Sequence, residues 1–159
     1  MGAILYAKGE PISWLALDWG EDDLALLKAE VGNPAWQAEW ELLAILIAVD
    51  TWLPRLRGEA ACLVQADATA VLFAAQRMAG RTAPMNALAA EIALRLESAQ
   101  VNLNTEHFRA TLNYSCDALS RLSQGAKVPQ RLLTVSRCWP RPRRAQFFWG
   151  WPKEMLQEE

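Results

Sequence analysis

A long apolar segment between two prolines is the feature of this sequence that most restricts its fold. Residues 35–53 read AWQAEWELLAILIAVDTWL and are rich in Ala and Leu. Asn33 and Pro34 supply an N-cap and a first-turn proline, and Pro54 supplies a stop. The sequence therefore predicts one long, mostly buried helix between these bounds.

Three groups of apolar residues have the pattern of β-strands. Residues 2–6 and 11–17 flank a turn at 8–10, and together they predict an antiparallel hairpin. Residues 61–66 form a compact apolar run that suits a central strand. Residues 101–106 begin as an alternation of apolar and polar side chains, which is typical of an edge strand.

Three more helices complete a mixed α/β layout. One runs from Asp67 or Thr69 to Met78, with either residue as a possible cap, and another begins at Pro84 and continues through Ser98. A short helix is predicted for residues 113–122. The acidic, then amphipathic segment 19–31 is left open between a loop and a short helix.

Length and charge predict one domain followed by a tail. The chain has 159 residues, of which 52% are hydrophobic, enough for one compact core. Residues 1–124 hold nine Lys or Arg against fifteen Asp or Glu, whereas residues 125–159 hold seven against three. We therefore expect a domain over residues 1–123 and a basic, Pro- and Trp-rich tail over 124–159 that is extended or disordered.

Cysteine usage and hydropathy predict a soluble protein of the cytoplasm or nucleus. The three cysteines are odd in number and widely spaced, and His107 is the only histidine, which fits neither a disulfide framework nor a zinc site. The longest apolar run, residues 42–49, is far shorter than a membrane span. We expect no membrane association.

Three carboxylates lie on or beside predicted elements, and one of them, Asp67, is at a strand end, where active sites of open α/β sheets commonly form. Glu41 lies on the long helix, Asp67 follows the central strand, and Asp117 opens the last helix. Each also has a simple structural explanation: Glu41 as a solvated residue, Asp67 as a helix cap, and Asp117 as a complement to the helix dipole. Hard divalent ions such as Mg²⁺ require oxygen ligands of this kind from separate elements.

The final motif, together with Glu41 and Asp67, resembles the ribonuclease H domain of reverse transcriptase polyproteins, especially those of gypsy-like retrotransposons. That family's segment reads His-x-Pro-Gly-x-x-Asn-x-x-Ala-Asp-x-Leu-Ser-Arg, whereas this chain has Arg109, Ala110 and Cys116 at the Pro, Gly and Ala positions. The similarity covers roughly residues 2–122. The positions that keep the register are His107, Asn113, Asp117, Leu119, Ser120 and Arg121.

The resemblance implies a ribonuclease H-like fold, a mixed five-stranded sheet flanked by helices, if one more strand is admitted around residues 22–31. It implies hydrolysis of the RNA strand of RNA/DNA hybrids by two Mg²⁺ or Mn²⁺ ions, held by Glu41, Asp67, Asp117 and a preceding Asp. That Asp would lie on the first strand, several residues before the Gly-Ala-Ile-Leu run of residues 2–5. The sequence begins inside this motif, so the first strand is expected to be incomplete. Metal binding and cleavage are therefore expected to be impaired, with His107 and Cys116 in structural roles.

Two other functions stay open at this point. The chain could be a non-catalytic nucleic-acid-binding or spacer module, with the reverse transcriptase segment of the same polyprotein as its partner. Without the resemblance, it could be a helical interaction protein that uses the apolar faces of residues 42–52 and 85–96. The non-catalytic module, like the enzyme, predicts that Glu41, Asp67 and Asp117 lie close together, whereas the helical interaction protein predicts that they do not.

Overall fold

The chain begins with a β-hairpin, as predicted. The structure is a computed structural model that describes residues 1–28, 30–109 and 113–140. Strand β1 (Gly2–Ala7) pairs antiparallel with β2 (Glu10–Ala16), with Gly2 opposite Ala16. Lys8 and Gly9 both have positive φ, 52° and 85°, the backbone conformation of the tight turns whose twist matches a hairpin.

The next segment, which the sequence left open, is a short helix, α1 (Glu21–Leu27). The Asp23 carboxylate accepts a hydrogen bond from the Gly20 N–H at 2.7 Å, and Glu21, Asp22 and Asp23 place negative charge at the helix N-terminus. The additional strand that the ribonuclease H pattern admitted around residues 22–31 is therefore wrong, because these acidic residues stabilise a helix start.

The long helix forms where it was predicted, although it passes its expected stop. A 3-10 turn, η1 (Pro34–Trp36), is capped by Asn33, whose Oδ1 accepts from the Ala35 N–H at 3.0 Å. Helix α2 (Gln37–Leu56) follows and contains Pro54. A proline removes only its own N–H from the hydrogen bonds of the last turn, and the Arg57 N–H still reaches the Leu53 carbonyl at 3.1 Å.

A strand–helix segment and then a helix–strand segment follow α2. Strand β3 (Ala61–Ala66) leads into α3 (Thr69–Arg77), and α4 (Ala83–Ala99) leads into β4 (Asn102–His107). β3 and β4 pair in parallel, from Ala61 opposite Asn102 to Ala66 opposite His107. Thr82 caps α4, and the predicted apolar face of α4 is buried at Met85, Leu88, Ile92 and Leu96.

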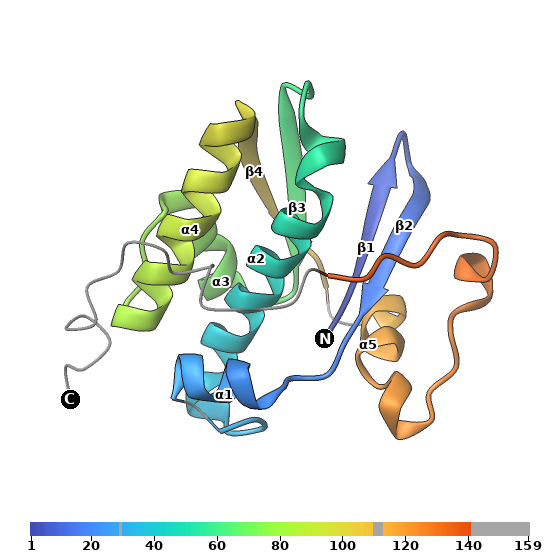
Figure 1. The fold of residues 1–159 in the computed structure, drawn as a ribbon, viewed down its shortest axis with the longest axis horizontal. Coiled ribbons are helices and arrows are strands. Elements are labelled where there is room, and N and C mark those ends of the chain that lie inside the picture. Colours follow the sequence, from blue (N-terminus) through green and yellow to red (C-terminus); the bar gives the residue numbers. More distant parts are fainter. Residues whose placement is uncertain (29, 110–112, 141–159) are drawn as a thin grey trace.

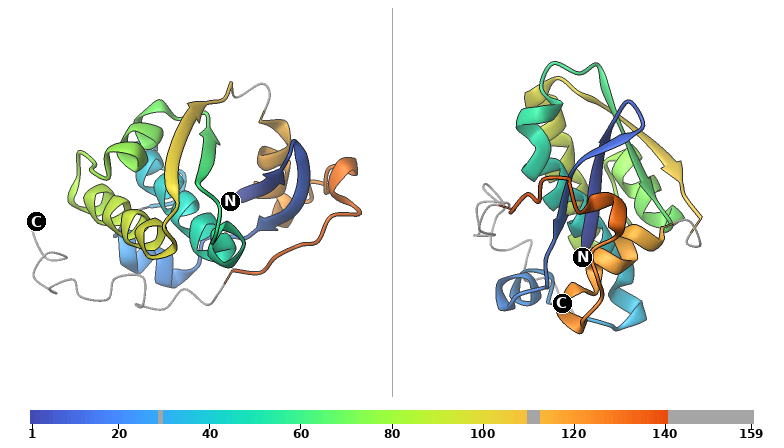
Figure 2. Two further views of the ribbon diagram at one scale, coloured as in Figure 1. Left: turned by 90° about the horizontal axis from the view of Figure 1, so that it is seen from above. Right: turned by 90° about the vertical axis from the view of Figure 1, so that its right-hand side faces the viewer.

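Helix α2 is the centre of the hydrophobic core. Leu42, Leu43, Leu46 and Ile47 are fully buried, and the helix contacts α3, α4, β1 and β3. Figure 1 shows α2 between the helical side of the molecule and the hairpin. The described residues thus make an α/β protein with one antiparallel and one parallel pair of strands, and β1 and β3 do not pair with each other. The views in Figure 2 show these two pairs as separate sheets.

The chain beyond the predicted domain boundary packs against the hairpin. After α5 (Tyr114–Ser120) and the 3-10 turns η3 (Leu122–Gln124) and η4 (Gln130–Leu132), it runs beside β2. The Trp14 N–H donates to the Ser136 carbonyl at 3.1 Å, and the Cys138 N–H donates to the Trp14 carbonyl at 2.7 Å. Residues 136–138 of the predicted tail therefore cover the outer edge of β2. Residues 141–159 lie outside the described residues, and the division into two domains stays a prediction.

Within the described residues, no helix combines the length and hydrophobicity that are needed to cross a bilayer.

Leu132 tests whether the C-terminal segment contributes to folding. Its side chain is 1% exposed and packs with Trp14, Ala16 and Leu119. We expect Leu132→Ala to lower the free energy of unfolding by about 2–5 kcal/mol, because it leaves a cavity in this cluster. Chemical denaturation followed by circular dichroism would measure the change.

Leu133→Ala is the matched control, since the neighbouring leucine is 68% exposed. It should change the free energy of unfolding by less than about 0.5 kcal/mol. Equal effects from the two substitutions would mean that the segment does not hold β2 in solution.

Candidate functional site

Glu41 has one satisfied and one unsatisfied carboxylate oxygen. It lies in the second turn of α2, where Gln37 Nε2 donates to its Oε1 at 2.7 Å. Its Oε2 is buried and has no hydrogen-bond partner among the residues that the structure describes. Burial raises the pKa of Glu41, the Gln37 hydrogen bond lowers it, and the nearby charge of Asp67 raises it again. This is an electrostatically unfavourable place for an isolated carboxylate.

Glu39, two residues earlier, is the structural glutamate of this helix. It is 3% exposed, and its Oε1 accepts a hydrogen bond from Thr82 Oγ1 at 2.8 Å. Thr82 is also the N-cap of α4, so Glu39 ties the start of α4 to α2. Glu41 has no comparable role in joining two helices.

Asp67 sits at the carboxyl end of β3, on the turn into α3. The residue that caps α3 is Ala68, and no side chain donates or accepts a cap hydrogen bond there. The expectation that Asp67 or Thr69 caps this helix is therefore wrong. His107, at the end of β4, donates from Nε2 to the Asp67 carbonyl oxygen at 3.2 Å. This contact agrees with a structural role for His107 and joins the ends of the two parallel strands.

Asp117 forms an ion pair with a basic neighbour, Arg121. It lies in the first turn of α5, 52% exposed, and one of its oxygens pairs with Arg121 Nη2 at 2.8 Å. Burial raises the pKa of the adjacent Cys116 to about 11, with Arg131 lowering it and Asp67 raising it. Cys116 therefore stays a neutral thiol at physiological pH, which agrees with a packing role.

The three elements meet, although the three carboxylates do not form one cluster. Asp67 influences the pKa of both Glu41 and Cys116, so α2, the end of β3 and the start of α5 lie close together. Within the described part of the chain, no group of three or more His, Cys, Asp or Glu side chains is arranged to hold a metal ion. Glu41 and Asp67 are the pair whose charges interact, and the metal-binding role predicted for Glu41, Asp67 and Asp117 stays a prediction.

Two residues that shape this site were missed in the sequence. Gln37 orients Glu41, and its i, i+4 spacing on the helix was the signal for it. Gly2 permits the close approach of β1 to α5, since a Cβ there would lie 2.5 Å from the Cys116 carbonyl oxygen and from Leu119 Cβ. That second contact joins residues more than a hundred positions apart, and no local pattern announces it.

Comparisons with protein-family models, with curated proteins and with solved structures found no match for this chain.

The raised pKa of Glu41 predicts how the stability of the fold depends on pH. Because the folded protein holds the Glu41 proton more tightly than the unfolded chain, stability falls as pH rises from the ordinary glutamate pKa of about 4.3 to the folded value. We expect Glu41→Gln to raise the melting temperature at pH 7, with a gain that shrinks toward pH 4. Differential scanning calorimetry across this range would measure it.

Glu97→Gln, at an exposed position of α4, is the control for the loss of one negative charge. A gain from Glu41→Gln that is no larger than that of the control, or that does not depend on pH, would contradict the burial of an unsatisfied carboxylate.

Proposed function

We propose that this chain is a ribonuclease H-like domain of a retroelement polyprotein, built for two-metal hydrolysis of the RNA strand in RNA/DNA hybrids. Hydrolysis would also require the first Asp of the family's set, which the resemblance matches to no residue of this sequence. The observation that carries the proposal is the buried, unpartnered Oε2 of Glu41 beside the charge of Asp67. A divalent cation would supply the missing partner of Oε2 and offset the repulsion between the two carboxylates.

The edges of the two sheets support the ribonuclease H-like fold. β1 (GAILYA) and β3 (ACLVQA) contain no charged residue, and each pairs with one strand only within the described residues. Exposed edge strands usually carry charges, prolines or bulges that prevent further pairing. β4 (NLNTEH) has such polar residues, and the outer edge of β2 is covered by residues 136–138. β1 and β3 thus resemble interior strands, each with one partner missing.

A strand placed between β1 and β3 would join the two pairs into one five-stranded sheet. Helix α2 contacts both β1 and β3, so it would cover one face of that sheet. An Asp on this strand would come near Glu41 and Asp67, because both lie where α2 meets the end of β3. The sequence placed the additional strand around residues 22–31, where the structure has α1, so the position between β1 and β3 is part of the present proposal.

The residues around the carboxylates have defined roles in this proposal. Mg²⁺ or Mn²⁺, when bound, would activate water and stabilise the departing oxygen. Gln37 holds one oxygen of Glu41 and leaves the other available to a cation. His107 fixes the backbone of Asp67 at the strand end. Asp117 would contribute only after it releases Arg121. The hybrid would be recognised through its 2′-hydroxyls and backbone shape, not by base sequence.

The ion pair of Asp117 also favours an alternative function. A carboxylate that is neutralised by Arg121 at 2.8 Å is a poorer ligand for a cation. A chain with only two available carboxylates fits a non-catalytic nucleic-acid-binding or spacer module. In either case the proposed partners are nucleic acid and the reverse transcriptase segment of the same polyprotein, in an intracellular compartment.

Cleavage of a labelled RNA/DNA hybrid tests the proposal. The chain, an Asp67→Asn variant, and a version extended by an Asp-bearing strand before Met1 would be compared in Mg²⁺ and then in Mn²⁺. We expect cleavage only by the extended version, because it completes the carboxylate set. That version should also melt at a higher temperature, because its added strand pairs the free edges of β1 and β3.

Asp67→Asn in the extended version is the matched control, and it should abolish cleavage without lowering the melting temperature. Cleavage by the unextended chain that depends on Asp67 would show that the predicted impairment is wrong. Failure of the extended version to cleave, although it folds and binds Mn²⁺, would favour the non-catalytic module.

A further inference from the structure

A shallow hollow lies between the start of α5 and the turn η4. It measures about 460 Å³ and is lined by Tyr114, Pro129, Gln130 and Arg131. Tyr114 is 62% exposed, so much of its aromatic ring faces solvent. The hollow therefore combines one cation, one amide and one exposed ring.

Arg131 is held in place by aromatic and hydroxyl contacts, not by an acid. Its guanidinium carbon lies 5.6 Å from the centre of the Tyr114 ring and 5.8 Å from that of Tyr6. Its Nη2 donates to the buried Oγ of Ser115 at 3.0 Å. Among the described residues it forms no ion pair, so its positive charge is not neutralised. An arginine fixed in this way loses less conformational entropy when it binds an anion.

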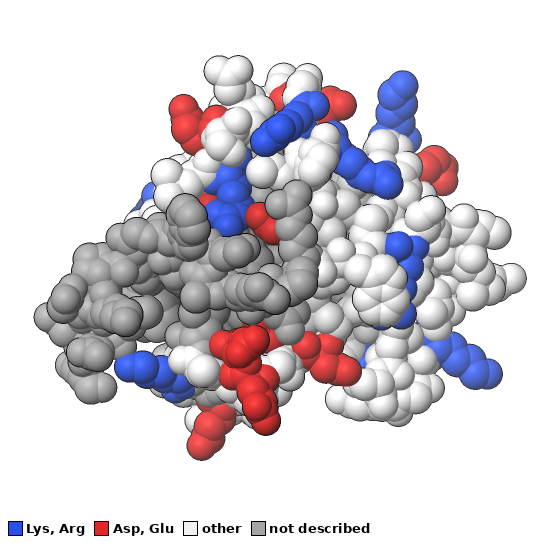
Figure 3. Space-filling view, viewed as in Figure 1, with Lys and Arg blue, Asp and Glu red and all other residues white. Residues whose placement is uncertain are grey.

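The C-terminal segment that carries Arg131 is basic in sequence. Residues 118–140 contain four Lys or Arg and no Asp or Glu. In Figure 3, acidic side chains gather at the lower edge of the molecule, over α1, while the side formed by the hairpin and the C-terminal segment shows mostly basic ones. Phosphate groups are attracted to such a surface, and they are repelled by the acidic α1 region.

The geometry points to a binding site for single-stranded nucleic acid, in which Arg131 binds a backbone phosphate and an adjoining base stacks on Tyr114. The guanidinium fork matches a phosphate, and base-aromatic stacking tolerates any sequence. An acidic peptide would use the charge of Arg131 but gain nothing comparable from the exposed Tyr114 ring. The site shares no residue with Glu41, Asp67 and Asp117, and it does not require hydrolysis.

Fluorescence anisotropy of a labelled fifteen-nucleotide single strand, titrated with the full chain, tests this site. We expect Arg131→Gln to weaken binding about tenfold or more, because it removes a charge-assisted hydrogen bond to phosphate. The slope of log K against log salt should fall by about 0.7, the value for one lost phosphate contact. Tyr114→Ala should weaken binding about fivefold or more, through lost stacking.

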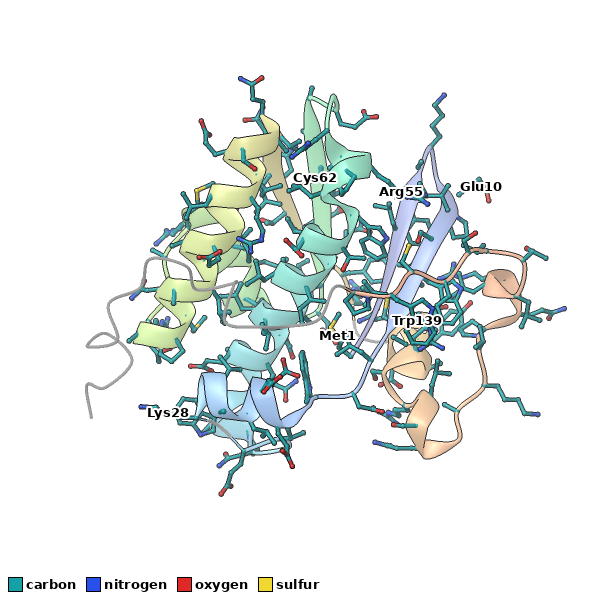
Figure 4. All side chains as sticks on the ribbon, viewed as in Figure 1. Met1, Glu10, Lys28, Arg55, Cys62 and Trp139 are labelled. Carbon is teal, nitrogen blue, oxygen red and sulfur yellow. The ribbon has the colours of Figure 1, made fainter. Side chains whose placement is uncertain are left out.

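Arg55→Gln is the matched control, since it removes one positive charge at the end of α2, outside the hollow. Figure 4 labels Arg55 and Trp139, and Trp139 marks the C-terminal segment beside the hairpin. This control should leave the affinity within about twofold and the salt slope unchanged. Because Arg131 contacts two tyrosines and Ser115, melting curves must accompany its variant. Tyr114→Ala changes an exposed side chain and keeps the test decisive if Arg131→Gln does not fold.

The proposal is overturned if Arg131→Gln and Tyr114→Ala, both folded, bind the strand as the Arg55→Gln control does. It is also overturned if an acidic peptide of equal charge binds more tightly than the strand, or if a nucleoside monophosphate binds as tightly as the strand. Hybrid cleavage depends on Asp67 whereas this binding depends on Arg131, so either property can fail alone.

Discussion

Burial of helix α2 determines where the chemically interesting residues lie. Its apolar side chains pack against α3, α4 and both strand pairs, so few faces of the helix reach the surface. Leu42 and Leu43 are fully buried in the core, while Glu41, beside them, is half-buried. The rotation of the helix is set by many kilocalories of apolar burial, which one carboxylate cannot change. The unfavourable position of Glu41 is therefore a consequence of core packing, and it persists unless a cation or a donor comes to Oε2.

The same helix explains how the fold tolerates two separate strand pairs. An isolated two-stranded sheet is marginal in water, and it needs a helix or further strands to be stable. Here α2 contacts β1 and β3, and the C-terminal segment covers the outer edge of β2. Helix α2 thus supports both strand pairs, and the C-terminal segment supports the hairpin as well. The edges of β1 and β3 retain backbone groups that a further strand could pair.

Local signals predicted most of the elements, and long-range contacts account for what was missed. The hairpin, α2, β3, α4 and β4 follow from turn residues, caps and apolar periodicity. The sequence also contains the capping interaction of Asp23 that makes α1 a helix, although the motif comparison favoured a strand there. The packing of residues 125–139 was not predicted, because it depends on Trp14 and Leu132, which lie far apart in the chain. The prolines and arginines of this segment predicted an extended or disordered tail. The described part of the segment, up to residue 140, instead packs against the hairpin.

In the candidate site, too, the sequence predicts which residues are involved, and the contacts in the structure decide their environment. The order of Glu41, Asp67 and Asp117 is visible in the sequence, whereas the state of each carboxylate is decided by its neighbours. Glu39 and Glu41 are not distinguished by the sequence. In the structure, Thr82 donates a hydrogen bond to Glu39, whereas Oε2 of Glu41 has no hydrogen-bond partner among the described residues. Asp117 depends on Arg121, four residues later, and i, i+4 spacing alone does not say whether such a pair forms.

Charge separates the two surfaces that we propose for nucleic acid. Glu41 and Asp67 repel a phosphate backbone unless divalent cations lie between them, so this site alone adds nothing to affinity at low metal concentration. Arg131 pairs with no acidic side chain of the described residues, so it would attract phosphate at any metal concentration. A nucleic-acid strand would then bind first to the C-terminal segment. It would contact Glu41 and Asp67 only when divalent cations are present. Binding and hydrolysis would thereby depend on different residues and on different ions in solution, even though a single domain carries both surfaces.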